Sequence, residues 1–217
     1  MEVGVPEEYY RGMKVWQRRP DPDTWTVRTA ERRTTYRAFP DGEGGTVYRA
    51  VRVDHADGGF LAIAYDRDSG LLSTLEDHHG RTVVFGQDDR RGLILSANLL
   101  CDGRLEMLAE YEYDGRRNLT RVCDRFGKAI EFAYDRDNRV VRRRNRNGMT
   151  YTWDYDRQGR VVRTSGDGGV QEGRIEYKDG YNEVHYPGTG ATEQYHFDDD
   201  GQVYLKVDAL GGETWYG

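Results

Sequence analysis

Histidines beside an acidic residue are the first groups in this sequence that could transfer protons or bind a metal. His78 and His79 follow Asp77, and imidazole and carboxylate groups are common metal ligands and acid–base groups. Adjacent residues in a strand or turn point in different directions, so they seldom bind one metal together. We therefore expect His78 and His79 to be exposed turn residues, and His185 and His196 to pack across strands.

A run of arginines is the one basic concentration in the chain. Residues 139–146 include five arginines, which could bind a polyanion beside exposed aromatic side chains. The alternative is a solvated strand whose arginines pair with carboxylates of adjacent repeats, such as Asp135, Asp137 and Asp156. We favour the strand.

Other runs resemble ligand sites only in part. Residues 198–200 are three aspartates, but Gly201 follows at once and no glutamate closes a calcium loop. Residues 166–169, Gly-Asp-Gly-Gly, lack the Lys-Ser/Thr of a phosphate loop. Both runs are expected to be turns.

Nucleophiles are also poorly placed for catalysis. None of the four serines lies in a Gly-x-Ser-x-Gly sequence, and Cys101 and Cys123 have no metal-ligand spacing. We expect free thiols rather than a disulfide. The sequence predicts no catalytic residue, no metal site and no cofactor, and a protein that is not an enzyme.

The strongest pattern is a Tyr-Asp pair that recurs every 21 residues, at Tyr113-Asp114, Tyr134-Asp135 and Tyr155-Asp156. Weaker copies are Tyr65-Asp66 and Phe197-Asp198. A period of this length indicates supersecondary units that stack on their neighbours to bury an apolar face. A residue that recurs in every unit is structural far more often than catalytic.

One unit predicts a β-hairpin. Residues 149–155 alternate aromatic or apolar side chains with polar ones, which is typical of a strand with one aromatic face. Asp156 to Gly159 reverses the chain, residues 160–163 form a returning strand, and Asp124 to Gly127 is an example of the turn to the next unit. The predicted fold is all-β, with consecutive hairpins forming a curved antiparallel ribbon.

Some units depart from this pattern. Arg117 and Asn138 occupy the position of Gly159, and because arginine is disfavoured at positive φ we expect another turn type at Arg117. Residues 93–110 are expected to form two longer strands rather than a helix.

The N-terminal part follows a looser pattern. Residues 35–39 and 46–53 are expected to be strands, and residues 18–23 a loop. We divide the chain into a β-rich lead-in segment, residues 1–53, and about six repeat units in residues 54–217.

Composition and charge exclude several classes of protein. The net charge of −6 argues against a general nucleic-acid binder, and no apolar run approaches the roughly 20 residues of a membrane span. The first eight residues lack the apolar core of a signal peptide, so export would use a route without a cleaved leader in this segment.

The repeat resembles the RHS/YD-repeat family, whose consensus is Tyr-Asp-x-x-Gly-Arg/Asn-Leu/Val, a short strand, and Asp-x-x-Gly. Tyr155 to Val161 fits throughout, and Tyr113 to Leu119 fits except at Arg117. The resemblance covers roughly residues 54–217. The residues assigned to the motif are Tyr65, Asp66, Tyr113, Asp114, Asp124, Gly127, Tyr134, Asp135, Gly148, Tyr155, Asp156, Gly159, Phe197, Asp198 and Gly201.

The resemblance implies an arc of a spiral shell. Such repeats enclose a toxic C-terminal domain in bacterial Rhs polymorphic toxins, including type VI secretion cargo, and in the C components of ABC toxins. The chain would be a non-catalytic opening portion of such a shell, made in the bacterial cytoplasm and secreted. Its partners would be the rest of the shell, the toxin cargo, and a secretion apparatus or chaperone. Either sheet face could line the cavity, although the aromatic face is better suited to packing between turns of the spiral.

The alternative is a carbohydrate- or cell-surface-binding module that acts as an oligomer, because related repeats occur in cell-surface proteins. Ligand or cargo contacts are then expected from Tyr151, Trp153, Arg142 and Arg144. Unpaired strand edges at the ends of the ribbon also predict self-association.

Overall fold

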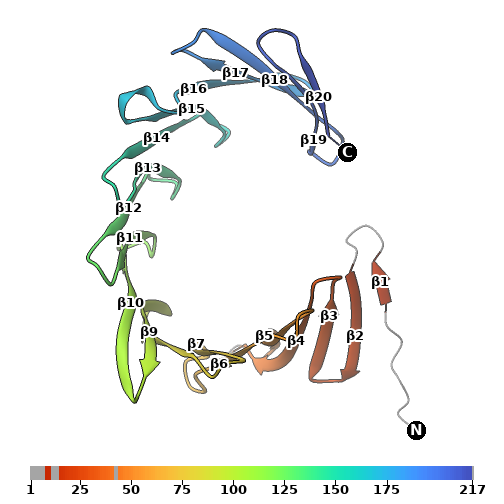
Figure 1. Cartoon of the computed structure of the whole chain (residues 1–217), viewed down its shortest axis with the longest axis vertical. Coiled ribbons are helices and arrows are strands. Elements are labelled where there is room, and N and C mark those ends of the chain that lie inside the picture. Colours follow the sequence, from red (N-terminus) through yellow and green to blue (C-terminus); the bar gives the residue numbers. More distant parts are fainter. Residues whose placement is uncertain (1–7, 11–14, 42–43, 217) are drawn as a thin grey trace. The chain divides into compact units, whose positions relative to one another are not determined.

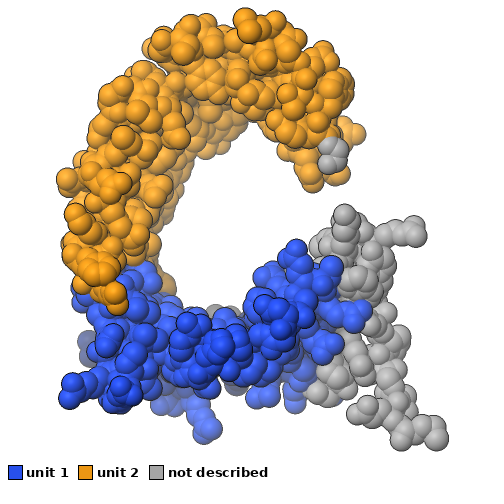
Figure 2. Space-filling view, viewed as in Figure 1, with its two compact units in different colours: residues 1–111 blue, residues 112–217 orange. Residues whose placement is uncertain are grey.

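The computed structural model describes residues 8–10, 15–41 and 44–216, with side chains from residue 22 onward. The chain divides into two compact units, Met1–Tyr111 and Glu112–Gly217 (Figure 2). The described residues form twenty strands and one short 3₁₀ turn, Asp167–Gly169. The predicted all-β fold of consecutive antiparallel hairpins is therefore confirmed.

The strands of the first unit pair antiparallel in chain order (Figure 1). They are β1 (Glu8–Tyr10), β2 (Val15–Asp21), β3 (Thr24–Arg28), β4 (Arg32–Pro40), β5 (Thr46–His55), β6 (Phe60–Tyr65), β7 (Leu72–Asp77), β8 (Thr82–Asp88), β9 (Leu93–Cys101) and β10 (Arg104–Tyr113), whose last two residues belong to the second unit. The expected strands at 35–39 and 46–53 lie in β4 and β5, and residues 93–110 form β9 and most of β10, without a helix.

The loop expected at residues 18–23 is wrong for most of its length. β2 continues to Asp21, which pairs with Thr24, so only residues 22 and 23 form the turn. Pro20 misled the prediction because proline has no N–H for a sheet ladder. The strand tolerates it because the register shifts between Arg18 and Asp21, an irregularity that releases this stretch from regular pairing.

The second unit repeats one hairpin after another. Its strands are β11 (Leu119–Asp124), β12 (Ala129–Tyr134), β13 (Val140–Arg144), β14 (Thr150–Tyr155), β15 (Val161–Gly166), β16 (Gly173–Tyr177), β17 (Tyr181–Tyr186), β18 (Ala191–Phe197), β19 (Val203–Val207) and β20 (Glu213–Trp215). Each pairs antiparallel with the next in the chain.

A bulge recurs at the same place in the repeat. The register shifts immediately before Tyr134, Tyr155 and Phe197, and also before Tyr65 in the first unit. A bulge puts two residues of one strand opposite one residue of its partner, which bends the strand and increases its twist. Repeated at these four turns, the bulge bends the sheet within each unit in a regular way.

The described part of the chain has almost no buried core. Leu93, Ala97, Cys123 and Leu205 are its only buried hydrophobic residues. Two compact domains, each of half the chain's 25.0 kDa, would together expose roughly 12,300 Å². This chain exposes 15,382 Å² because the described strands of each unit form a single layer of sheet, with no second layer from the described residues on either face (Figure 1). Among the described residues, no helix has the length and apolar character needed to cross a bilayer.

Candidate functional site

The aspartate of the Tyr-Asp pair closes the turn that follows it. The Asp156 amide donates to the Arg160 carbonyl (2.9 Å), and the Gly159 amide donates to the Asp156 carbonyl (3.1 Å). One carboxylate oxygen of Asp156 accepts from the amides of Gln158 and Arg160, both at 2.9 Å. Gly159 has φ +82°, which explains the glycine in this position. One carboxylate thus holds a five-residue turn.

The same pattern holds turns at both edges of the ribbon. A carboxylate accepts from the amides two and four residues on at Asp114, Asp124, Asp135 and Asp198. In the turn that ends at Gly148 and Met149, the side-chain oxygen of Asn145 does the same. The turn at Asp66 is one residue longer, and its carboxylate accepts from Asp68 and Ser69.

These hydrogen bonds favour the ionised carboxylate. The side-chain hydrogen bond from Arg81 is the largest cause that lowers the pKa of Asp77 to about 2. The hydrogen bond from the Arg139 amide is the largest cause that lowers the pKa of Asp135. The pKa values of Asp66, Asp114 and Asp208 are also lowered. The turn carboxylates are therefore charged structural acceptors and unsuited to proton transfer near neutral pH.

The expectation of another turn type at Arg117 is wrong. Arg117 has φ +70° and donates its amide to the Asp114 carbonyl at 3.1 Å, as Gly159 does to Asp156. The left-handed conformation costs a non-glycine residue about 1–2 kcal/mol. Asp114 offsets that cost by accepting from the Arg116 amide and from both the amide and the side chain of Asn118. Asn138 takes the same conformation, with φ +60°.

The tyrosine of the pair ties its hairpin to the preceding one. The hydroxyl of Tyr134 donates to the Leu119 carbonyl and that of Tyr155 to the Val140 carbonyl, both at 2.7 Å. Two further tyrosines make the equivalent bond, Tyr65 to Ala50 at 2.9 Å and Tyr177 to Val161 at 2.8 Å. Burial raises the pKa of Tyr65, Tyr134 and Tyr177, so these hydroxyls stay protonated donors. Phe197 occupies the corresponding position without a hydroxyl.

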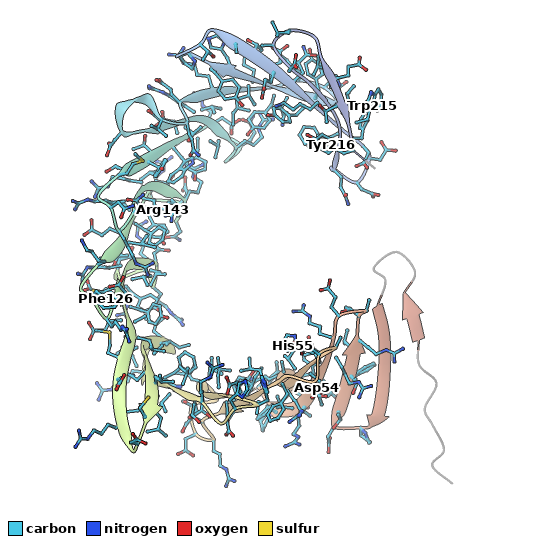
Figure 3. The ribbon with its side chains drawn as sticks, viewed as in Figure 1. Asp54, His55, Phe126, Arg143, Trp215 and Tyr216 are labelled. Carbon is cyan, nitrogen blue, oxygen red and sulfur yellow. The ribbon has the colours of Figure 1, made fainter. Side chains whose placement is uncertain are left out.

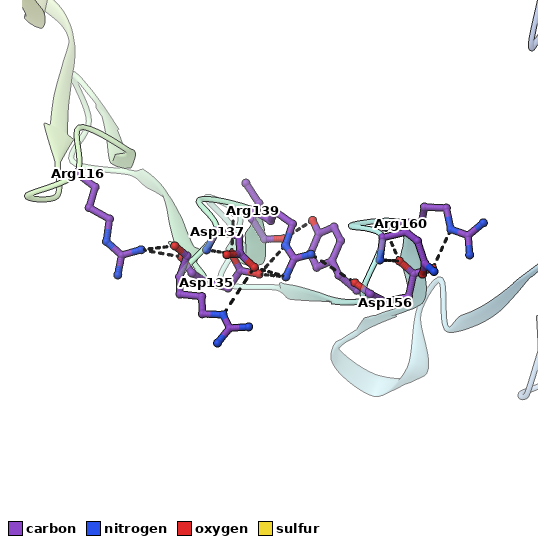
Figure 4. A network of polar contacts seen from close by, with 10 residues as sticks. Arg116, Asp135, Asp137, Arg139, Asp156 and Arg160 are labelled. Atoms are coloured by element: carbon purple, nitrogen blue, oxygen red, sulfur yellow. Dashed lines mark hydrogen bonds and ion pairs between the residues drawn. The ribbon is translucent and has the colours of Figure 1, made fainter.

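Arginines join consecutive turns along this edge (Figure 4). Arg139 forms an ion pair with Asp135 in its own turn (2.7 Å), donates to the Asp156 carbonyl of the next turn (3.5 Å), and lies 4.8 Å from the Tyr155 ring centre. Arg160 repeats the ion pair with Asp156 at 2.8 Å. Arg139 thus links its own turn to the next one, while Arg160 pairs within its own turn and lies 4.2 Å from the Tyr177 ring centre.

The arginine run mostly pairs with carboxylates, as favoured. Arg139 contacts Asp135 and Asp137, while Arg144 lies 3.6 Å from Glu131 and Arg146 lies 3.0 Å from Asp124. The sequence did not indicate Glu131 or Asp124 as partners, because the pairing depends on which strands are adjacent. Asp156 contributes its backbone carbonyl to Arg139 rather than its carboxylate.

The histidines are turn and strand residues, but one argument about them fails. The rings of His78 and His79 lie only 3.8 Å apart, because a tight turn does not alternate its side chains as a strand does. His196 stacks on Tyr181 across the ladder, with ring centres 5.1 Å apart. His185 lies 3.2 Å from the Thr192 hydroxyl. Within residues 8–10, 15–41 and 44–216, no three His, Cys, Asp or Glu residues gather as metal ligands.

Two hollows lie beside Tyr-Asp turns at equivalent places in the two units. A hollow of 420 Å³ is lined by Phe39, Arg49 and the turn that follows Tyr65. One of 430 Å³ lies between the turns that follow Tyr134 and Tyr155. Neither combines a serine or cysteine with a histidine. Cys101 and Cys123 are free thiols, as expected.

The four residues expected to contact a ligand lie on opposite faces of the sheet. Cross-strand partners share a face, and Arg143 pairs with Tyr151, while Arg142 pairs with Thr152 and Arg144 with Thr150. Tyr151 and Trp153 therefore share a face with Arg143, and Arg142 and Arg144 lie on the other. Sequence reasoning missed Arg143, although strict alternation along residues 140–144 would have indicated it.

Comparisons with known proteins agree with the repeat. Residues 134–170 match the RHS repeat family. The structure of TcdB2-TccC3-Cdc42 is 11% identical, with a TM-score of 0.42, and the match covers 87% of this chain and 16% of that one. TcdB2-TccC3 is 12% identical (TM-score 0.41, covering 81% and 14%). The Photorhabdus luminescens Tc holotoxin pore is 10% identical (TM-score 0.34, covering 85% and 15%).

This chain spans only about 15% of the length of those chains. No curated protein matches it. The matched residues 134–170 contain the Tyr155-Asp156 turn, and the same carboxylate-closed turn and tyrosine bond recur on either side of them. Residues 134–170 are thus similar to the RHS repeat family.

Proposed function

We propose that this chain is a non-catalytic segment of an Rhs-type bacterial toxin shell, which encloses a C-terminal toxic domain and helps to deliver it. The observation that carries the proposal is the single-layer sheet with two unlike faces. In each unit the described strands form consecutive hairpins, and the described residues supply no second layer of the kind that an independent domain uses to bury its apolar face.

From β12 to β16, one face of the sheet is largely apolar and aromatic. Register places on it Ile130, Phe132, Tyr134, Tyr151, Trp153, Tyr155, Ile175 and Tyr177. All are half-buried, although nothing lies over them. The opposite face carries Glu131, Arg142, Arg144, Thr152, Asp154, Arg163 and Glu176. A face of the first kind favours contact with another polypeptide, and a face of the second kind favours water.

The remaining elements of the proposal follow from this assignment. Residues 1–53 are the lead-in to the shell, and residues 54–217 are its repeats. The partners are the rest of the shell and the toxin cargo. Delivery uses a secretion apparatus of the type VI kind or a chaperone, in competition between bacteria. The motif tyrosines, aspartates and glycines act as structural residues.

The test is the intact mass of the native polypeptide, followed by limited proteolysis. We expect a mass well above 25.0 kDa and a protease-resistant shell that protects a C-terminal fragment. The same digestion in urea is the control, because unfolding must abolish the protection. A native mass of 25.0 kDa, or a C-terminal fragment that is cleaved as fast as free protein, would contradict enclosure.

A carbohydrate-binding module is the second candidate, and a row of aromatic rings favours it. On the face opposite Trp153, Tyr181 stacks on His196, and Tyr204 lies 6.3 Å from His196 and 5.9 Å from Trp215. Trp215 is 65% exposed and can stack on a sugar ring (Figure 3). A glycan array tests this candidate: signal lost in Trp215→Ala supports it, and no signal from the wild-type chain counts against it.

A further inference from the structure

Arg143 is an exposed cation on the apolar face of the second unit (Figure 3). It pairs in register with Phe132 on β12 and with Tyr151 on β14, so an aromatic side chain flanks it on each side. Trp153 lies two residues along β14 from Tyr151 and therefore on the same face. Within strands β12 to β14 this face is otherwise apolar or aromatic, so a guanidinium there is unusual.

The charge of Arg143 has no counterion in the described part of the chain. Its neighbours Arg139, Arg144 and Arg146 all form ion pairs, whereas Arg143 forms none there, and no hydrogen bond. The carboxylates of the adjacent strands cannot supply one. Glu131 pairs in register with Arg144, so it projects from the other face, as does Asp154, which pairs with Arg163.

The aromatic side chain beside Arg143 is held in place. The Tyr151 hydroxyl lies 2.9 Å from the Met149 sulfur. Its ring packs on Gly166, which is buried and pairs with Tyr151 in register. A methyl group on Gly166 would lie 3.1 Å from a Tyr151 ring atom, so glycine leaves the ring its space. The surface is largely preformed, which reduces the entropy lost when a ligand binds.

We infer that Arg143, Phe132, Tyr151 and Trp153 form a docking surface for an extended polypeptide segment in which an aspartate or glutamate is flanked by apolar side chains. The carboxylate pairs with Arg143, and the apolar side chains cover the rings. Charge complementarity and the uncovered apolar face select this occupant. The inference rests on the proposed function, since cargo inside a shell would supply such segments.

The experiment compares two neighbouring arginines on opposite faces. The 217-residue chain is titrated into a fluorescein-labelled peptide in which leucine and glutamate occupy every second position in turn, with serine between them, so that both side-chain types lie on one face of the extended peptide. Binding is measured by fluorescence anisotropy. Arg143→Gln should weaken binding about tenfold, because it removes a charge-assisted hydrogen bond. Arg142→Gln removes the same charge from the other face and should leave binding unchanged. Replacing each glutamate of the peptide by glutamine should weaken wild-type binding and leave the Arg143→Gln variant unaffected.

Equal losses in both variants would overturn the inference, because they would show binding to net charge alone. Binding of a carboxylated oligosaccharide that depends on Arg143, in the absence of peptide binding, would overturn the choice of a polypeptide. Either result leaves enclosure untouched, since the protease protection of the longer native polypeptide is measured separately. A loss of protection with intact, Arg143-dependent peptide binding would instead contradict enclosure alone.

Discussion

The tyrosine and the aspartate of the repeat do different work. The Asp156 carboxylate accepts hydrogen bonds from two amides of its own turn, whereas the Tyr155 hydroxyl donates to the Val140 carbonyl in the preceding hairpin. The aspartate thus determines local geometry, and the tyrosine links one unit to the next. Tyr177 shows that the two can separate, because it keeps the link to Val161 although Lys178 replaces the aspartate and the turn is shorter.

Removing one tyrosine hydroxyl should therefore weaken the link between hairpins. We expect Tyr155→Phe to lower the free energy of unfolding by about 1 kcal/mol, the usual net value of a hydrogen bond. Urea unfolding followed by circular dichroism measures the change. Tyr204→Phe is the matched control, since the Tyr204 hydroxyl makes no hydrogen bond within the described residues. Equal stability of Tyr155→Phe and wild type would show that the link is not stabilising.

Arg117 predicts a change in the opposite direction. Glycine at this position removes the steric cost of φ +70°, and we expect Arg117→Gly to raise the free energy of unfolding by about 0.5–1 kcal/mol, after the entropy cost of glycine. Arg116→Gly is the control. Arg116 donates to the carbonyls of Asp135 and Arg136, so its removal should destabilise. Destabilisation by Arg117→Gly would show that the arginine side chain stabilises this turn.

At the scale of the element, alternation and turn residues predicted most of the structure. Residues 149–155 were recognisable as a strand because aromatic and polar side chains alternate. Asp156 to Gly159 was recognisable as a turn because aspartate accepts hydrogen bonds from nearby amides and glycine readily adopts a positive φ. Contacts between neighbouring repeat hairpins were not predictable from the sequence. The hydrogen bond from Arg139 to the Asp156 carbonyl depends on strand register and on a bulge, and no single residue indicates where that bulge lies.

The turn carboxylates make the hairpins sensitive to acid. The folded-state pKa values of Asp66, Asp77, Asp114, Asp135, Asp156 and Asp208 are lowered. The stability that these carboxylates contribute is therefore present above the unfolded pKa of 3.8 and is lost as the pH falls through the folded pKa, about 2 for Asp77. We expect the strand signal in circular dichroism to decline between pH 4 and 2. Asp77→Asn should reduce this dependence, whereas Asp89→Asn should not, because Asp89 is an exposed turn residue that makes no hydrogen bond within the described residues. A signal unchanged down to pH 2 would contradict the prediction.

For the molecule as a whole, the single-layer sheet leaves unpaired backbone groups at the outer edge of its last strand. Strands β12 to β19 each pair with a strand on both sides, but in the described part β20 pairs only with β19. Its outer edge presents free backbone donors and acceptors beside Trp215, which is 65% exposed. Such an edge is a template for another strand, and no bulge or proline in β20 blocks it.

We therefore expect the 217-residue chain to self-associate through β20. Sedimentation velocity should show a concentration-dependent dimer, and Trp215→Lys should weaken it at least tenfold, because a charge at an edge strand opposes pairing. Phe126→Lys is the matched control, since Phe126 is also an exposed aromatic residue (75%) but lies in a turn rather than at the sheet edge (Figure 3). A dimer that both substitutions weaken equally would indicate association through general hydrophobic contact. A monomer at every concentration would show that this edge does not recruit a second copy, and that the strand it accepts has to be chemically different from β20 itself.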